Sequence, residues 1–119
     1  PNFVIAHRHS DEYIGQLELS GVDYRHGVAS LGIVVGGKGC RGKGYGSEAI
    51  GLALEFAFRQ MNLNRVELWV REDNDIALKC YRSCGFVEEG RRRSCYAVDG
   101  VRKDLVLMGI LQDEWERRL

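Results

Sequence analysis

The first part of the chain alternates short apolar runs with polar turns. Residues 3–6 form a β-rich run, and a polar stretch at 7–12 separates it from residues 13–19, where polar and apolar positions alternate with a period of two. That period is typical of a strand with one buried face. A second polar stretch at 20–27 precedes another apolar run at 28–35. The pattern predicts three strands joined by turns, and therefore an antiparallel start to the sheet.

The centre of the chain changes to a helical period. After Ser47, apolar residues stand at positions 50, 54, 57 and 58, with 53 and 61 on the same face. We therefore expect an amphipathic helix that Ser47 caps and that ends at 62–64. Residues 65–70 then form another strand. The two strands and the helix make a βαβ unit with parallel strands, and its loop lies where α/β sheets bind ligands.

A second helix is expected after residue 74. Asn74 is a typical helix cap, and Gly85 is typical of the left-handed residue that ends a helix. Phe86 is expected to pack back on this helix at the start of a strand.

The remainder of the chain predicts a β-hairpin. Asp99 and Gly100 stand between two β-rich runs and are a strong hairpin signal. The run at 104–111 is too apolar for an edge strand, so we expect it between two neighbours. The charged tail at 112–119 is expected to be a short helix.

Composition excludes several classes of protein. The 119 residues are enough for one domain, 1–119, and 17 basic residues balance 17 acidic ones, so no nucleic-acid partner is indicated. No apolar run approaches the roughly 20 residues that cross a membrane. The cysteines at 40, 80, 84 and 95 form no C-x-x-C pair or metal-ligand cluster. Free thiols in a reducing cytoplasm, with no metal, are therefore expected.

A glycine-rich stretch at 36–47 joins the strand to the first helix. Six of its twelve residues are glycine, and such backbone can direct successive N–H groups at a phosphate. The stretch does not fit a Walker A loop, because Gly44 stands where that loop requires a residue with a hydroxyl group. A dinucleotide reading needs a carboxylate at a strand end about 20 residues later, whereas Glu67 falls in mid-strand. The third pattern is Arg41-x-x-Gly44-x-Gly46.

This third pattern resembles the pyrophosphate loop of the GNAT superfamily of acetyl-CoA-dependent N-acetyltransferases. A second stretch, Asn74-x-x-Ala77-x-x-x-Tyr81-x-x-x-Gly85-Phe86, also resembles a hallmark of that superfamily. The C-terminal half is most similar to the branch that includes ribosomal-protein N-terminal and spermidine acetyltransferases. The resemblance implies an α/β fold: a GNAT-like mixed sheet with antiparallel N-terminal strands, a central βαβ unit and a C-terminal β-hairpin. The family's amino-terminal strand and two helices have no counterpart before Phe3.

The resemblance also implies a cofactor site for acetyl-CoA, without a metal. Backbone N–H groups of residues 41–46 would hold the diphosphate, and the strand at 28–35 would pair with the pantetheine arm, with Gly32 easing a bulge. The expected cofactor contacts are Ile33, Val34, Val35, Arg41, Gly42, Lys43, Gly44, Tyr45, Gly46, Ser47 and Asn74.

The catalytic residues are expected to be Tyr81 and Glu18. By resemblance, Tyr81 is the general acid that returns a proton to the CoA thiolate. The amine must lose a proton, and at pH 7 an alkyl amine of pKa about 10.4 is neutral only about once in 2,500. Ser30 stands where many relatives have a glutamate. Glu18 is therefore the best remaining candidate for the base, and His26 is the next candidate. His7 and His9 are weaker candidates for proton transfer.

The function implied is direct transfer of an acetyl group to a primary amine of a small molecule, a polyamine or a protein N-terminus. The basic run at 91–93 slightly favours an acceptor that carries acid groups. No membrane partner is expected, and the domain could form a homodimer. The alternative is a truncated or degenerate CoA-binding module with a regulatory role and no turnover.

Overall fold

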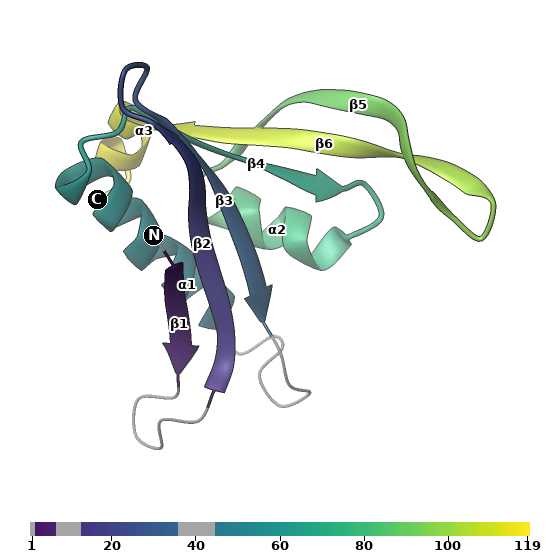
Figure 1. The fold of residues 1–119 in the computed structure, drawn as a ribbon, viewed down its shortest axis with the longest axis horizontal. Helices are drawn as coiled ribbons and strands as arrows, with labels where there is room; N and C mark the ends of the chain where they lie inside the picture. The colour runs from purple at the N-terminus through teal and green to yellow at the C-terminus, as the bar shows by residue number, and fades with distance from the viewer. Residues whose placement is uncertain (1, 7–12, 36–44) are drawn as a thin grey trace.

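A single mixed sheet organises the chain. The computed structural model describes residues 2–6, 13–35 and 45–119. The strands are β1 (Asn2–Ala6), β2 (Tyr13–Asp23), β3 (Val28–Val35), β4 (Arg65–Arg71), β5 (Val87–Val98) and β6 (Val101–Leu111), and the helices are α1 (Tyr45–Glu55), the π-helix η1 (Phe56–Gln60), α2 (Asp75–Ser83) and α3 (Gln112–Arg117). Within the described residues the strand order is β1-β2-β3-β4-β6-β5, and only β3 and β4 pair in parallel (Figure 1). The predicted sheet is therefore confirmed.

The turn between β2 and β3 is shorter than predicted. β2 continues to Asp23, beyond the expected end at residue 19. The Asp23 carboxylate accepts hydrogen bonds from the backbone N–H groups of Arg25 and His26, at 3.0 and 3.1 Å, so its side chain closes a turn at 24–27. The register irregularity lies between Ser20 and Asp23, and pairing with β2 runs through Gly32 without a shift. The expected bulge at Gly32 is therefore wrong.

The first helix begins before its predicted cap. α1 starts at Tyr45, so Ser47 lies inside the first turn and the expectation that it caps the helix is wrong. The helix continues into η1, and the backbone N–H of Met61 donates to the carbonyl of Phe56 at the end. The wider π-turn keeps Ala57 and Phe58 buried.

The C-terminal elements follow the sequence pattern closely. Asn74 caps α2, Gly85 has φ 103°, and Phe86 is buried and donates its N–H to the carbonyl of Tyr81. Asp99 and Gly100 have φ of 50° and 78°, as a type I′ hairpin turn requires. β6 lies between β4 and β5, and α3 follows it, both as predicted.

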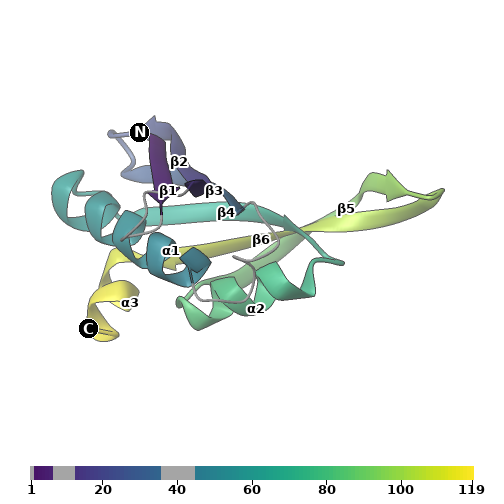
Figure 2. The ribbon, with the colours of Figure 1, turned by 90° about the horizontal axis from the view of Figure 1, so that it is seen from below.

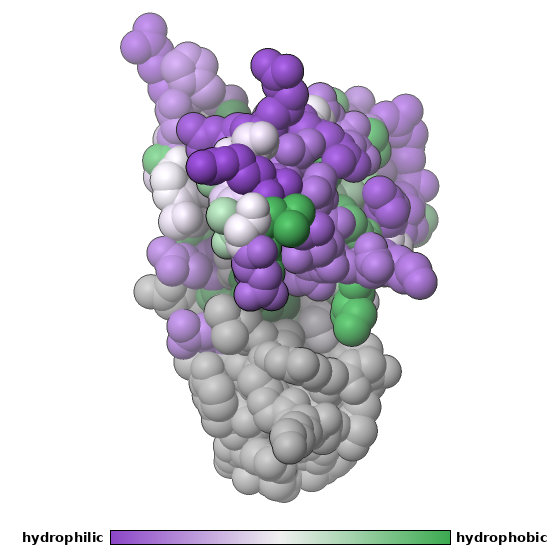
Figure 3. Space-filling view, turned by 90° about the vertical axis from the view of Figure 1, so that its right-hand side faces the viewer, coloured by the Kyte–Doolittle hydropathy of each residue, from purple (hydrophilic) through white to green (hydrophobic). Residues whose placement is uncertain are grey.

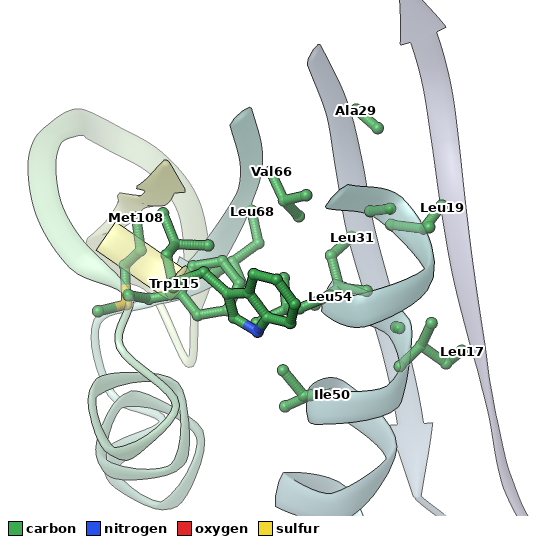
Figure 4. Close-up of a cluster of buried hydrophobic side chains, with 14 of the residues drawn as sticks. Leu17, Leu19, Ala29, Leu31, Ile50, Leu54, Val66, Leu68, Met108 and Trp115 are labelled. Atoms are coloured by element: carbon green, nitrogen blue, oxygen red, sulfur yellow. The ribbon is translucent and has the colours of Figure 1, made fainter. Parts of the chain in front are cut away.

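The helices lie together on one face of the sheet (Figure 2). Alternate side chains of β4 and β6, such as Val66 and Ile110, face them and are fully buried. Trp115 of α3 closes this core (Figure 4). Its ring lies 5.4 Å from the ring of Phe58. Each fully buried side chain of this kind contributes about 1.5–3 kcal/mol. No described helix is long and apolar enough to span a membrane.

The other face of the sheet carries the remaining strand side chains, including Trp69, which is 45% exposed. β5 and β6 extend past the end of β4 as a two-stranded arm (Figure 1). No residue of β5 is buried, and the face at that end of the molecule is largely hydrophilic (Figure 3).

Candidate active site

A wedge opens between the two parallel strands. β3 and β4 pair at Val28 with Arg65, Ala29 with Val66 and Ser30 with Glu67, and no further pair joins them. β3 nevertheless continues to Val35 beside β2, and β4 continues to Arg71 beside β6. Beyond Ser30, one edge of β3 therefore has no strand partner over five residues, about 16 Å at 3.3 Å per residue.

This unpaired edge includes three of the predicted cofactor contacts. Ile33, Val34 and Val35 all belong to β3 beyond the last pair with β4. Their backbone groups on that side can bind an extended chain as a neighbouring strand would. The predicted contacts Arg41, Gly42, Lys43 and Gly44 lie outside the described residues.

The N-terminus of α1 is the second part of the site. Tyr45, Gly46 and Ser47 form its first turn. The first N–H groups of a helix have no partner within the helix, and the helix dipole makes this end favourable for an anion. Because α1 begins earlier than expected, these three predicted contacts offer helical N–H groups in place of loop backbone.

Contacts with Ser47 hold α1 against α2. The Ser47 hydroxyl and the Cys80 sulfur lie 3.3 Å apart, within hydrogen-bond range. The Cys84 thiol points to the Ser47 carbonyl from the next turn of α2, at 4.0 Å. Cys80 is adjacent in sequence to Tyr81, so the first turn of α1 and the predicted catalytic helix turn lie side by side. Cys80, Cys84 and Cys95 are free thiols, as predicted.

Tyr81 is half-buried beside Phe86, with the two rings 5.8 Å apart. Burial raises the pKa of Tyr81 to about 12, and the neighbouring sulfurs of Cys80 and Cys84 add to the effect. The described residues offer its hydroxyl no hydrogen-bond partner. The hydroxyl therefore keeps its proton at neutral pH and can donate a hydrogen bond to a ligand, and its role as the general acid stays a prediction.

Asn74 has the structural role that the sequence predicts. Its Oδ1 accepts a hydrogen bond from the N–H of Ala77 at 3.1 Å. Arg71, Asp73 and Asn74 line an open hollow of about 290 Å³ at the end of β4. Asn74 therefore lies at the carboxyl end of a wedge strand, and its contact with a cofactor stays a prediction.

Glu18, the first candidate base, belongs to β2 and to neither of the two wedge strands. Glu18 is exposed on β2, opposite Gly32 of β3, and its neighbours Leu17 and Leu19 face the helices. It therefore points to the open face, one strand away from the wedge, and its catalytic role stays a prediction.

The predicted histidines do not reach the wedge in the described residues. His26 lies in the turn at the opposite end of β3, where its Nδ1 is 2.7 Å from the carboxylate of Asp23. This hydrogen bond lowers the pKa of Asp23. His7 and His9 lie outside the described residues.

Sequence reasoning did not consider Glu67 as a candidate site residue. Its mid-strand position argued against a dinucleotide loop, but the pairing places it at the apex of the wedge, opposite Ser30. The alternation of β4 carried part of this signal, because buried Val66 and Leu68 flank Glu67 and so direct it to the other face. The pairing with β3 was the missing part.

Comparison with known proteins agrees with this geometry. The family model of the acetyltransferase (GNAT) family matches residues 1–86. A spermidine N(1)-acetyltransferase of Vibrio cholerae is 34% identical over 105 residues, which are 88% of this chain and 60% of the relative. A putative ribosomal N-acetyltransferase, YdaF of Bacillus subtilis, is 31% identical over 102 residues, 86% of this chain and 55% of the relative. The chain therefore spans a little over half the length of these relatives.

Solved structures give the same result. The Vibrio cholerae spermidine N-acetyltransferase in complex with CoA and spermine superposes with a TM-score of 0.88 and 32% identity, covering 97% of this chain and 67% of that one. Mutant forms of the spermidine/spermine N-acetyltransferase SpeG from the same organism give a TM-score of 0.89 over 98% of this chain and 69% of theirs. The family model covers residues 1–86, which include both wedge strands, α1 and Tyr81. This chain therefore belongs to the GNAT family of acetyltransferases.

Proposed function

We propose that this chain transfers the acetyl group of acetyl-CoA to a primary amine by direct attack within a ternary complex. The observation that carries the proposal is the contact of Ser47 with Cys80, which holds the first turn of α1 beside the helix turn that bears Tyr81. The wedge is then bordered by three groups: the first turn of α1 for an anion, the unpaired edge of β3 and the protonated Tyr81. These are the groups that a diphosphate, an extended pantetheine arm and a departing thiolate need.

The residues present fit acetyl-CoA as the donor substrate. The N–H groups of Tyr45, Gly46 and Ser47 would bind the diphosphate together with residues 41–44, and the free edge of β3 at 33–35 would hydrogen-bond the pantetheine arm. The donor supplies an activated thioester. The chain has to orient that thioester, take a proton from the amine and stabilise the thiolate.

Tyr81 would act on the thiolate mainly as a hydrogen-bond donor. With the pKa of Tyr81 raised to about 12 and that of a thiol near 8.5, complete proton transfer from tyrosine to thiolate is uphill by about 4.8 kcal/mol. A hydrogen bond from a neutral hydroxyl to a thiolate has no such cost. Tyr81 therefore stabilises negative charge as the carbon–sulfur bond breaks, and the thiolate can leave without full protonation.

The acceptor that we favour is an aliphatic amine of the polyamine type. Relatives at 34% and 29% identity are named spermidine N(1)-acetyltransferases. The basic run at 91–93 is a weaker argument for an acidic acceptor than the sequence suggested, because Arg91 is paired with Glu72, Glu88 and Asp104. Free thiols at Cys80, Cys84 and Cys95 suit a reducing compartment such as the cytoplasm.

The test combines calorimetry with a thiol-release assay. We expect acetyl-CoA to bind the chain and CoA to be released when spermidine or another primary amine is added, but not with a tertiary amine control. Binding without release on any amine would instead support the CoA-binding module. Absence of acetyl-CoA binding would contradict both functions. Gly44→Asp should abolish binding, because it places a carboxylate where the diphosphate is expected.

A further inference from the structure

Two side chains of β4 border the wedge on the open face of the sheet. Glu67 belongs to the last pair between β3 and β4, and Trp69 is the next residue of β4 with the same orientation. α1 and α2 cover the other face (Figure 2), and Tyr81 belongs to α2. If the thiolate leaves toward Tyr81, a nucleophile can reach the thioester only from the face on which Glu67 and Trp69 lie.

Glu67 is held in place by a charged cluster. The Nε–H of Arg65 donates to Glu67 Oε1 at 3.0 Å, while Nη1 and Nη2 donate to the two carboxylate oxygens of Glu89, the first at 2.8 Å. Glu89 and, more weakly, Glu67 raise the pKa of Arg65, so the guanidinium is permanently charged. One cation thus faces two carboxylates. The cluster has a net charge of −1, and among the described residues Glu67 Oε2 has no donor.

The cluster is also built for rigidity. A Cβ at Gly109 of β6 would lie 2.7 Å from Nη1 of Arg65 and 2.7 Å from Oε2 of Glu89, so glycine at this position allows the guanidinium to lie flat on the strand. The Arg65 side chain is only 20% exposed and that of Glu67 26% exposed. A bidentate pair that reaches from β4 across β6 to β5 has little freedom, so the open oxygen of Glu67 has a defined position.

Trp69 supplies an apolar surface next to this oxygen. Its side chain is exposed on the same face, and the Arg92 guanidinium of β5 lies 5.8 Å from the centre of its ring. An indole face binds methylene groups by dispersion and attracts cations through its quadrupole. A carboxylate oxygen followed by an indole matches an ammonium group followed by an alkyl chain.

We propose that Glu67 and Trp69 form the acceptor side of the wedge, with Glu67 binding the ammonium group and taking its proton while Trp69 covers the aliphatic chain. This inference rests on the proposed acetyl transfer. The bound ammonium first gives one proton to Glu67, which passes it to solvent, so that the neutral nitrogen can attack the thioester carbon. As the nitrogen–carbon bond forms, the nitrogen becomes acidic and its second proton passes to Glu67. The carbon–sulfur bond breaks, the thiolate leaves toward Tyr81, and Glu67 returns its proton to solvent. The acceptors selected are alkyl amines without a negative charge near the nitrogen.

The test uses Glu67→Gln, Trp69→Ala and the control Glu88→Gln in the 119-residue chain. Glu88 pairs with Arg82 and Arg91 and sits next to Glu89 in β5, so its variant also loses one ion-paired carboxylate but leaves the Arg65 cluster intact. We expect Glu67→Gln to lower kcat/KM for spermidine about 100-fold and to flatten its dependence on pH below neutrality, with the acetyl-CoA Kd within twofold of the parent. Trp69→Ala should raise the KM about tenfold and change kcat little, and Trp69→Phe should recover most of the loss.

Spermidine binding without donor separates failure of the inference from failure of the proposed function. By calorimetry, we expect Glu67→Gln to weaken spermidine binding at least fivefold and Glu88→Gln to leave it unchanged, whether or not the chain turns over. Equal spermidine affinity in parent and Glu67→Gln, or a kcat/KM within twofold across the pH range, would overturn the inference. Loss of thermal stability without either change would assign Glu67 to the fold alone.

Discussion

The Ser47 hydroxyl and the Cys80 sulfur lie 3.3 Å apart and join the first turn of α1 to the middle of α2. Residues 33 positions apart thereby hold the first turn of α1 beside the helix turn that bears Tyr81. The packing here is tight and partly buried, with the Cys84 thiol directed at the Ser47 carbonyl from the next turn. A bulky group on Cys80 would therefore displace the first turn of α1.

Alkylation of Cys80 should block cofactor binding. In a Cys40→Ser, Cys95→Ser background, N-ethylmaleimide should raise the acetyl-CoA Kd at least tenfold, about 1.4 kcal/mol. Cys84 should react slowly, because burial raises its thiol pKa. Adding Cys80→Ser should protect binding, since a hydroxyl can keep the contact with Ser47. Calorimetry before and after treatment measures this, and full affinity in the alkylated background would contradict the role of the contact.

Tyr81→Phe should spare binding and slow turnover. The described residues give the Tyr81 hydroxyl no hydrogen-bond partner, so its removal should change the unfolding free energy by less than about 0.5 kcal/mol. The kcat should fall about 10- to 100-fold, because the thiolate loses its donor. Stopped assays of CoA release measure kcat, and chemical denaturation measures stability. An unchanged kcat would remove Tyr81 from the mechanism.

The raised pKa of Tyr81 predicts a loss of stability in strong base. The hydroxyl ionises near pH 10 in the unfolded chain and near pH 12 in the folded one. Its stabilising contribution is therefore complete below pH 10 and is lost as the pH rises toward 12. Thermal unfolding of the parent and Tyr81→Phe between pH 8 and pH 11.5 should show a steeper decline in the parent. Parallel curves would contradict the burial effect.

The Arg65–Glu89 pair predicts sensitivity to acid. Hydrogen bonds from Arg65 lower the pKa of Glu89 from its ordinary value of 4.5, so the stabilisation is present above pH 4.5 and is lost as the pH falls through the folded pKa. Glu89→Gln should lower the unfolding free energy at pH 7 by about 1–3 kcal/mol and reduce the difference between pH 7 and pH 3. Denaturant titrations at both pH values measure it. A Glu89→Gln chain with the parent's full acid sensitivity would refute the assignment.

Gly109→Ala should destabilise the chain, because the new methyl group meets the Arg65–Glu89 pair at 2.7 Å. We expect a loss of about 1–3 kcal/mol, since the side-chain ends can move only by breaking their hydrogen bonds. Gly90→Ala is the matched control in the neighbouring strand, where a Cβ meets nothing within 4 Å. Urea unfolding of both variants gives the comparison. Equal unfolding free energies of the two variants would show that the Arg65–Glu89 pair accommodates the methyl group without loss of stability.

Local chemistry made much of the fold predictable from sequence. The cap at Asn74, the left-handed Gly85 and the Asp99-Gly100 turn depend on a few neighbouring residues, and all three are confirmed. The errors include the ends of two elements. Asp23 closes its own turn and lets β2 run longer, and α1 starts at Tyr45 in place of the predicted cap.

By itself, the sequence determined the order of the strands and helices along the chain and the position of Tyr81 on a capped helix, because periodicity and short motifs encode these. Phosphate binding by the loop at 36–47 stays a prediction. Only the tertiary structure decided where β3 leaves β4, and therefore that Glu67, and not Glu18, lies at the apex of the wedge. Strand register depends on side chains far apart in the chain. The Arg65–Glu89 pair spans 24 residues, and no local pattern could reveal it.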